Sequence, residues 1–366
     1  MVSLIPSHDL GLVNLRRRGR VGLGMAALAA VLAAALLCSL GIGAVGLEPG
    51  TILSILLAPL GIDLPWSFAP RDEAVLYAIR MPRTLLGLLV GAGLALAGAA
   101  LQGLFRNPLA DPALIGVSSG AAMAAVAVIV AGAPLMSLFG AGMASSVLPM
   151  AAFLGGLAAT VIVYGVASRN GETDVPTMLL AGVAINAIAG AAIGMLIFLS
   201  DDQQLRDLSF WLLGSLGGVT WAKLLPAVPL LVLGLVTLPL FACHLNAFLL
   251  GESDAFHLGF NVERSKRTIV ALAALLVGAG VALTGIIGFV GLVVPHVVRL
   301  LLGPDHRALL PASALLGGGL MLLADLAART LVLPAELPIG ALTSCIGGPF
   351  FLAMLLCRRG QGGLRC

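Results

Sequence analysis

The chain has 366 residues, of which 60% are hydrophobic and 10% charged, with a formal net charge of +3 and a mean hydropathy of +1.09. Soluble domains carry about 25% charged residues, so this composition excludes a soluble globule. Apolar segments fill most of the chain, which excludes collagen-like, disordered and disulfide-scaffold proteins. The sequence therefore predicts an all-α polytopic membrane protein.

Ten apolar segments have the length of a membrane-spanning helix, since a bilayer core of ~30 Å needs about 20 helical residues. They are residues 21–47, 84–105, 113–133, 147–167, 176–199, 222–242, 268–286, 287–302, 309–333 and 338–357. The stretch from Thr268 to Val298 is too long for one crossing. A cluster of helix-breaking residues is predicted to divide it into two helices: Gly285, Gly288, Gly291 and Pro295.

Both termini are predicted to be cytoplasmic. Four arginines, Arg16, Arg17, Arg18 and Arg20, precede the first segment, which is longer than the core of a signal peptide and is interpreted as a retained anchor. Of the 20 Lys and Arg residues, 14 then fall on the cytoplasmic side, in agreement with the positive-inside rule. The expected organisation is a tail over 1–20, one permease domain over 21–357 and a tail over 358–366.

An internal similarity joins residues 88–98 (LLVGAGLALAG) to residues 275–285 (LLVGAGVALTG), with nine identities in eleven. The copies are placed at the openings of the second and seventh spans. Five spans separate them, so they should run in opposite directions. An inverted repeat of spans 2–5 and 7–10 is therefore predicted, as in many transporters. Convergence of Gly- and Ala-rich packing surfaces is the alternative.

HExxH and Walker A sequences are absent. No catalytic residue, resident cofactor or metal is therefore predicted, and any ATP chemistry must come from another chain. Five cysteines without metal-ligand spacing are interpreted as structural thiols: Cys38, Cys243, Cys345, Cys357 and Cys366. Three aspartates between spans five and six are interpreted as a solvated loop: Asp201, Asp202 and Asp207.

One acid, Asp325, lies inside an apolar span, with Arg329 one helical turn later, so the two should pair. Ion-coupled transporters usually need intramembrane carboxylates as relays. A secondary transporter therefore remains an alternative, but the chain supplies few of the groups it requires.

Two charged segments are candidate binding sites. The cytoplasmic loop over about 245–267 is of mixed charge, and apolar residues predicted to be exposed there suggest a docked partner, with a plain connector as the alternative. They are Phe248, Leu249, Leu250, Phe256, Leu258 and Phe260. On the outer side, Arg80 and Arg83 could form a positive ring with Arg329 and pair with carboxylates; interfacial snorkelling is the alternative.

Several motifs occur in one order along residues 70–360. They are Arg80-Met-Pro-Arg83-Thr84, Gly98–Gln102, Arg106–Pro112, Gly116–Ser118, Leu250–Glu252, Leu258–Gly259, Gly288–His296 and Ala335–Gly340. Together they closely resemble the FecCD-type permeases, the membrane subunits of ABC importers for ferric siderophores, haem and cobalamin. The first 70 residues lie outside this resemblance.

The resemblance implies a dimer of ten-span permeases with a path along its twofold axis. Each copy would dock one cytoplasmic ATP-binding subunit, which holds ATP and magnesium. The segment that fits the ATPase would comprise Leu250, Gly251, Glu252, Ala255, His257, Leu258 and Gly259. Arg80, Arg83 and Arg329 would meet glutamates of a periplasmic substrate-binding protein.

The function expected is therefore import of an iron chelate across a Gram-negative inner membrane, with no nucleic-acid partner. Haem is favoured because residues 255–259 and 261–264 look like those of haem permeases. A ferric siderophore or cobalamin is the alternative substrate. An ion-coupled secondary transporter and an intramembrane enzyme are the other classes that remain.

Overall fold

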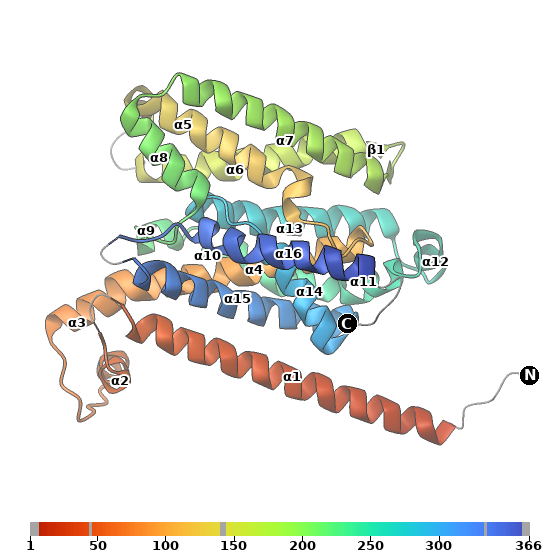
Figure 1. Ribbon diagram of the computed structural model, residues 1–366, viewed down its shortest axis with the longest axis horizontal. Coiled ribbons are helices and arrows are strands. Elements are labelled where there is room, and N and C mark those ends of the chain that lie inside the picture. The colour runs from red at the N-terminus through yellow and green to blue at the C-terminus, as the bar shows by residue number, and fades with distance from the viewer. Residues whose placement is uncertain (1–6, 44–45, 140–143, 333–334, 361–366) are drawn as a thin grey trace, which may run out of the picture.

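The computed structural model describes residues 7–43, 46–139, 144–332 and 335–360, which form a bundle of helices aligned along one axis (Figure 1). Its α-helices are α1 Ser7–Gly41, α2 Pro49–Leu57, α3 Pro70–Ala74, α4 Met81–Leu104, α5 Val117–Phe139, α6 Ala144–Ala167, α7 Val175–Phe198, α8 Asp202–Leu213, α9 Trp221–Leu224, α10 Val228–Thr237, α11 Ala242–Phe248, α12 Glu252–His257, α13 Val262–Thr284, α14 Val290–Leu302, α15 His306–Thr330 and α16 Ile339–Gly360. Four short 3-10 or π turns join them: Ala58–Leu60, Val75–Arg80, Pro112–Ile115 and Leu238–Phe241. Strands β1, Ser168–Arg169, and β2, Glu172–Thr173, form one antiparallel hairpin.

Within the described residues, 7 helical stretches are long and apolar enough to cross a membrane. They are Gly19–Gly41, Pro70–Leu104, Ser146–Ala167, Val175–Phe198, Val228–Phe248, Val262–Thr284 and His306–Thr330. Three shorter apolar helices, in α5, α14 and α16, coincide with the other predicted segments. The all-α, polytopic class is confirmed, while the count of ten crossings stays a prediction.

Two predicted spans are displaced. The first helix ends at Gly41, not at residue 47, and it begins at Ser7, so it extends into the predicted N-terminal tail. The sixth span runs over Val228–Phe248 instead of 222–242, because Pro229 lies in the first turn of α10 and starts the helix there. The C-terminal residues 361–366, with Cys366, lie outside the described part.

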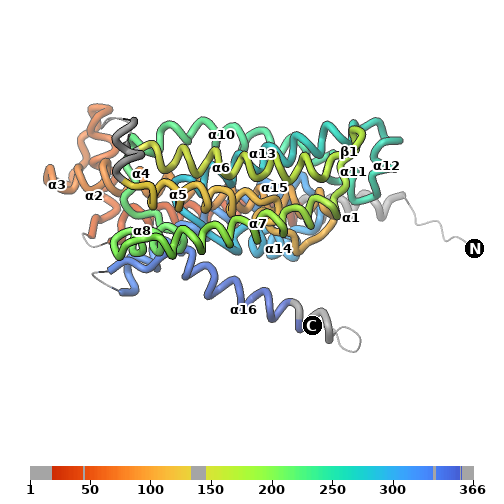
Figure 2. Tube along the Cα trace, turned by 90° about the horizontal axis from the view of Figure 1, so that it is seen from above, coloured from red at the N-terminus to blue at the C-terminus, as the bar shows by residue number. Residues whose placement is uncertain are grey.

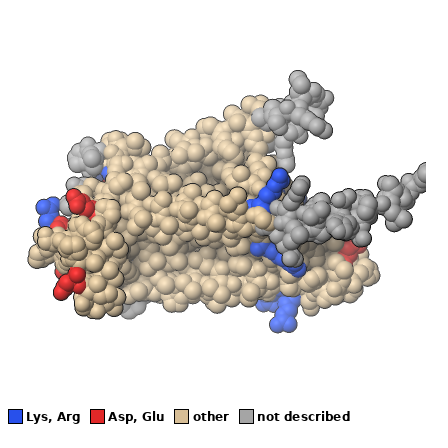
Figure 3. Space-filling view, turned by 90° about the horizontal axis from the view of Figure 1, so that it is seen from below, with Lys and Arg blue, Asp and Glu red and all other residues tan. Residues whose placement is uncertain are grey.

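On the face shown in Figure 3, charged side chains lie toward the two ends of the bundle, and a broad belt without Lys, Arg, Asp or Glu separates them. Helices α2, α3 and α8 lie at one end of the bundle and α12 lies at the other (Figure 2). Helix α1 begins and α16 ends toward the end where α12 lies (Figure 1). A bilayer around the belt is compatible with this arrangement.

Helix α4 is the centre of the bundle and packs against α13, α14 and α15. Every residue from Leu89 to Leu104 is buried. A Cβ atom on Gly91 would overlap the carbonyl of Gly317, and one on Gly98 would overlap the backbone of Gly291. Small residues therefore set the close approach of these helices, as is usual where lipid supplies no hydrophobic driving force.

The two copies of the internal similarity lie against each other at one level of the bundle. A Cβ on Gly280 would lie 3.3 Å from Val90, and one on Gly93 would lie 3.4 Å from Leu276, so the segments are antiparallel. The second copy was predicted to open its span, but it covers the end of α13. Close packing accounts for the shared glycines, and the inverted repeat stays a prediction.

The predicted break in the stretch from Thr268 to Val298 is confirmed. Helix α13 ends at Thr284, Gly285 has a φ of 72°, and α14 begins at Val290. Pro295 lies inside α14 and does not cause the break. Contacts from two other segments fix this turn, because Ser215 N donates to Thr284 O at 2.7 Å and Gly340 packs against Ile286 O.

The acidic segment between α7 and α9 is exposed, as expected, but it is helical and not a loop. Asp201 caps α8 by accepting hydrogen bonds from the backbone N–H groups of Gln203 at 2.9 Å and Gln204 at 2.8 Å. The described thiols Cys38, Cys243 and Cys345 are free.

Two glycines of α6 offer a matched test of this packing. A Cβ on Gly155 would lie 2.6 Å from Gly120 O and 2.5 Å from the Cβ of Ala124, whereas nothing lies within 4 Å of one on Gly165. Gly155→Ala should lower the free energy of unfolding by about 1–3 kcal/mol through overpacking. Gly165→Ala should stay within about 1 kcal/mol of wild type, on the stabilising side. Unfolding titrations in mixed detergent micelles measure both; equal stabilities would contradict the packing argument.

Candidate functional site

At the end of the bundle opposite α12, the guanidinium of Arg83 lies between two carboxylates. Its Nη2 is 2.8 Å from Asp325 Oδ1 and its Nη1 is 2.9 Å from Glu336 Oε1. Asp325 lies on α15 and is 1% exposed, whereas Glu336 precedes α16 and is 47% exposed. Arg83 therefore has one buried, fixed partner and one partner at the surface, both held by charge-assisted hydrogen bonds.

The other two arginines hold the end of α1. Arg329 Nε lies 3.6 Å from Asp325 Oδ2, which confirms the predicted pair, and its Nη2 donates to Ser39 O at 2.7 Å. Arg80 donates to the carbonyls of Leu40 and Gly41, the latter at 2.8 Å. Carbonyls at a helix C-terminus lack helical partners and carry partial negative charge, so guanidinium groups are suited to them.

The three predicted outer arginines are thus brought together, but they are not an exposed ring. Arg80, Arg83 and Arg329 are 4%, 11% and 9% exposed, and each is engaged within the chain. The interpretation as simple interfacial snorkelling does not describe them either. Two partners went unrecognised in the sequence: the end of α1, and Glu336, although Glu336 lies in one of the family-like motifs.

At the opposite end, the segment 245–267 comprises the end of α11, α12 and the start of α13. The expected apolar surface is present, because four side chains are exposed there: Leu249, Leu250, Phe256 and Leu258. Phe248 and Ala255 are instead buried in the core, on the inner faces of α11 and α12. Ala255 therefore contributes to the site by seating α12 and not by surface contact.

Glycines bound α12 on both sides. Gly251 has a φ of 124° and Gly259 a φ of 88°, a backbone region that residues with a Cβ rarely adopt. These two residues turn the chain sharply, so that α12 projects as a short separate helix beyond the bundle (Figure 1). The exposed ring of His257 packs edge-on against Phe256, with centroids 5.9 Å apart.

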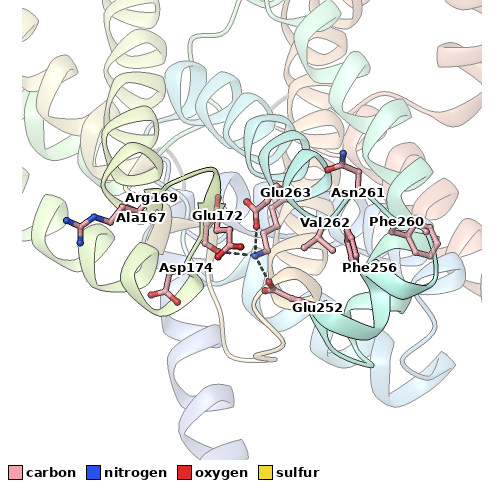
Figure 4. Close-up of a pocket in the computed structure, with 13 residues that line it drawn as sticks. Ala167, Arg169, Glu172, Asp174, Glu252, Phe256, Phe260, Asn261, Val262 and Glu263 are labelled. Carbon is pink, nitrogen blue, oxygen red and sulfur yellow. Dashed lines mark hydrogen bonds and ion pairs between the residues drawn. The ribbon is translucent and has the colours of Figure 1, made fainter.

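A pocket of about 950 Å³ lies beside α12 and is lined by α12, α13 and the β1–β2 hairpin (Figure 4). Lys266 lies at its base. Four acidic residues line the pocket: Glu172, Asp174, Glu252 and Glu263. Hydrogen bonds from the hydroxyl and the backbone N–H of Thr177 lower the pKa of Asp174, which keeps this cap of α7 ionised.

Lys266 donates to three oxygen atoms: Glu252 Oε2 at 2.6 Å, Glu263 Oε1 at 3.0 Å and Thr173 O at 2.9 Å. It is one of two lysines in the chain, and the sequence analysis counted it only as a cytoplasmic charge. The available signal was its helical spacing from the apolar Ile269, Val270 and Ala273, because a lysine on that face of α13 must find partners or reach water.

The geometry offers little support for ion-coupled transport. Asp325 is the acid found inside an apolar span, and it is neutralised by Arg83 and Arg329, so it is not free to carry a proton or sodium ion. In the part of the chain that the structure describes, no group of three or more His, Cys, Asp or Glu residues could hold a metal ion.

Comparison with known proteins gives one family. The model of the FecCD transport family matches residues 31–357. The hemin transport system permease protein of Yersinia pestis is 47% identical over 81% of this chain and 88% of that protein. A cobalamin import system permease of Halobacterium salinarum is 44% identical over 81% and 76%, and a vitamin B12 import permease of Escherichia coli is 41% identical over 79% and 86%.

Two solved structures share the architecture. A metal-chelate type ABC transporter in an inward-facing conformation superposes with a TM-score of 0.78 at 33% identity, over 91% of this chain and 98% of that one. A complex from Streptococcus pneumoniae superposes with a TM-score of 0.52 at 17% identity, over 77% and 93%, and shows likeness of fold alone.

Removing the buried carboxylate should be far more costly than removing the exposed one. Asp325→Asn leaves Arg329 without a charged partner and Arg83 with only the exposed Glu336, and should lower the free energy of unfolding by roughly 3–5 kcal/mol. Glu336→Gln, a matched amide replacement at the surface, should cost about 0–1 kcal/mol. Both are measured by unfolding titrations in mixed micelles. A Glu336→Gln loss as large as that of Asp325→Asn would refute this ranking.

Proposed function

Because the chain belongs to the FecCD transport family, we propose that it is the permease subunit through which an ATP-driven importer moves haem from the periplasm to the cytoplasm. The family match over residues 31–357 carries the general proposal. The choice of haem rests on the hemin permease relative. Cobalamin or a ferric siderophore is the alternative, because cobalamin permeases are almost as similar.

The protein is a multi-pass inner-membrane transport subunit, and we propose that two copies enclose the path. Helix α7 supports this assembly. It is largely unburied, and its Gly190 and Gly194, four residues apart, have nothing within 4 Å of where a Cβ would stand. Such a small-xxx-small pattern suits close contact with another helix. Exposed apolar side chains of α7, such as Phe198, surround it.

Two ATP-binding subunits would dock at α12, one on each copy, and would carry the ATP and magnesium. The support is the exposed apolar surface of Leu250, Phe256 and Leu258 on a projecting helix, outside the apolar belt that lipid covers. Docking there would require α12, the start of α1 and the end of α16 to face the cytoplasm. The same side holds the basic ends of α13 and α15, with Arg264, Arg267 and Arg307, in keeping with the positive-inside rule.

A periplasmic substrate-binding protein would dock at the opposite end, near Arg80, Arg83 and Arg329. Since these arginines already have partners in the chain, an incoming carboxylate must compete for them. Glu336 is the partner that can yield, because it is exposed and sits on a connecting segment, whereas Asp325 is buried in α15. Docking through Arg83 would then exchange one carboxylate for another, with little net change in charge pairing.

Reconstitution tests the function. Proteoliposomes holding this chain and its ATP-binding subunit, with the binding protein outside, should accumulate haem only with ATP inside, and should not accumulate cobalamin. Native mass spectrometry should give two permeases and two ATPases. Uptake that persists without the ATPase and follows a proton gradient would instead establish a secondary transporter, and selective uptake of cobalamin or a ferric siderophore would reassign the substrate.

Substitution of Leu258 tests the proposed ATPase-binding surface. Leu258→Asp places a charge on the apolar surface and should weaken ATPase binding by at least about 30-fold, as loss of an interface hot spot does. Leu258→Met keeps an apolar side chain and should bind like wild type. Both variants should still insert, since the spans are unchanged. Wild-type co-purification of the ATPase with Leu258→Asp would exclude α12 as the docking site.

One substitution at the arginine end should strengthen docking of the binding protein instead of weakening it. Glu336→Gln removes the competing carboxylate and should tighten binding of the binding protein, by up to about fivefold for an exposed pair. Glu73→Gln removes the same charge at the same end, on α3, and should leave the affinity unchanged. Affinities are measured on nanodiscs at low salt. Weaker binding by Glu336→Gln would show that Glu336 does not compete for Arg83.

A further inference from the structure

We propose that Lys266 is a positioning residue that joins α12 to the start of α7, so that displacement of α12 moves the β1–β2 hairpin and α7 with it. The inference rests on the proposed function in one respect, since it takes α12 as the place where the ATPase acts. It adds the route by which that action reaches a membrane-spanning helix far from α12 in the sequence.

The three acceptors of Lys266 come from three different segments. Glu252 is the first residue of α12, Glu263 lies in the first turn of α13, and Thr173 belongs to β2 (Figure 4). The distances lie between 2.6 and 3.0 Å, so all three donors of the ammonium group are used. A single side chain thus joins the projecting helix, the long helix behind it and the hairpin.

Burial makes this junction stiff. The Lys266 side chain is 3% exposed, so the ammonium group cannot exchange its partners for water. Breaking one contact leaves a charge poorly solvated, which is costly in a site of low dielectric.

The hairpin transfers its position directly to α7. Thr173 is followed by Asp174, which caps α7 through Thr177, and Asp174 N donates to Ala167 O at the end of α6 at 3.0 Å. The hydroxyl of Thr173 also donates to Tyr164 Oη at 2.9 Å. With so few residues between the contact and the helix, a shift of Thr173 is a shift of the first turn of α7.

Helix α7 is the element on which such a shift has most effect. It packs mainly on α5 and α6, and little of it is buried within this chain. Helix α4, by contrast, is enclosed along its length. Within one copy of the chain, a displacement applied at the hairpin therefore meets less packing resistance in α7 than it would in the central helices.

The ion pair with Glu252 can be removed without emptying the core, because Glu252 is 40% exposed. Glu252→Gln keeps the shape and removes the charge, so Lys266 keeps Glu263 and Thr173 and has at most a weaker hydrogen bond to the amide oxygen on α12. Asp254→Asn removes the same charge from α12 at an exposed position that makes no ion pair among the described residues, and is the matched control. Lys266→Met removes the whole junction, with Lys223→Met, at an exposed lysine, as its control.

Hydrogen exchange on the permease–ATPase complex in nanodiscs tests the inference, with and without magnesium, ATP and vanadate. In wild type, nucleotide trapping should change exchange in α12 and in residues 168–177. In Glu252→Gln the α12 response should remain and most of the hairpin response should be lost, while Asp254→Asn should keep both. Lys266→Met should lose the hairpin response, and Lys223→Met should keep it.

A hairpin response of wild-type size in Glu252→Gln would overturn the inference, as would a wild-type hairpin that does not respond when α12 does. Should Lys266→Met fail to fold, Glu252→Gln still decides the matter. Failure of the ATPase to co-purify with the wild-type chain, or to protect α12, would refute the proposed function instead. The hairpin response therefore tests the inference, whereas ATPase binding and protection of α12 test the proposed function.

Discussion

The structure depends on one interaction in particular, the ion pair between Arg83 of α4 and Asp325 of α15. An isolated charge inside an apolar bundle is prohibitively costly, so neither side chain could be placed there without the other. Their pairing fixes the level of α4 against α15. Arg329 then uses the same carboxylate and reaches the end of α1 through Ser39 O, which positions a helix with little buried surface. Three helices are thereby aligned at one end of the bundle.

Close packing makes that ion pair possible. Helix α4 approaches α15 at Gly91 and Gly317 and approaches α14 at Gly98 and Gly291, where no Cβ atom fits. In a bilayer, apolar side chains gain little by leaving lipid, so contact area and hydrogen bonds decide which helices associate. The glycine contacts supply the area along α4, and the arginine contacts supply the specificity at its end.

Local patterns were readable from the sequence and remote partners were not. Hydropathy located the helices, and the spacing of Asp325 and Arg329 predicted their pair, because both depend on residues within one helix. Arg83 and Glu336 are 253 positions apart, and Lys266 and Thr173 are 93 apart, so no periodicity joins them. The two similar Gly-rich segments lie against each other in the bundle, a contact that the sequence did not predict, and the inverted repeat stays a prediction.

The two ends of the bundle use buried charge in different ways. At the arginine end, the fixed partner of Arg83 is the buried Asp325, and the exposed Glu336 is its second partner. At the α12 end, Lys266 is buried, but its contact with α12 is made by the half-exposed Glu252. A molecule whose helices must change their relation to one another needs one end that keeps its alignment and one that responds. The distribution of buried and exposed carboxylates assigns the first role to the arginine end and the second to the end that carries α12, the hairpin and α7.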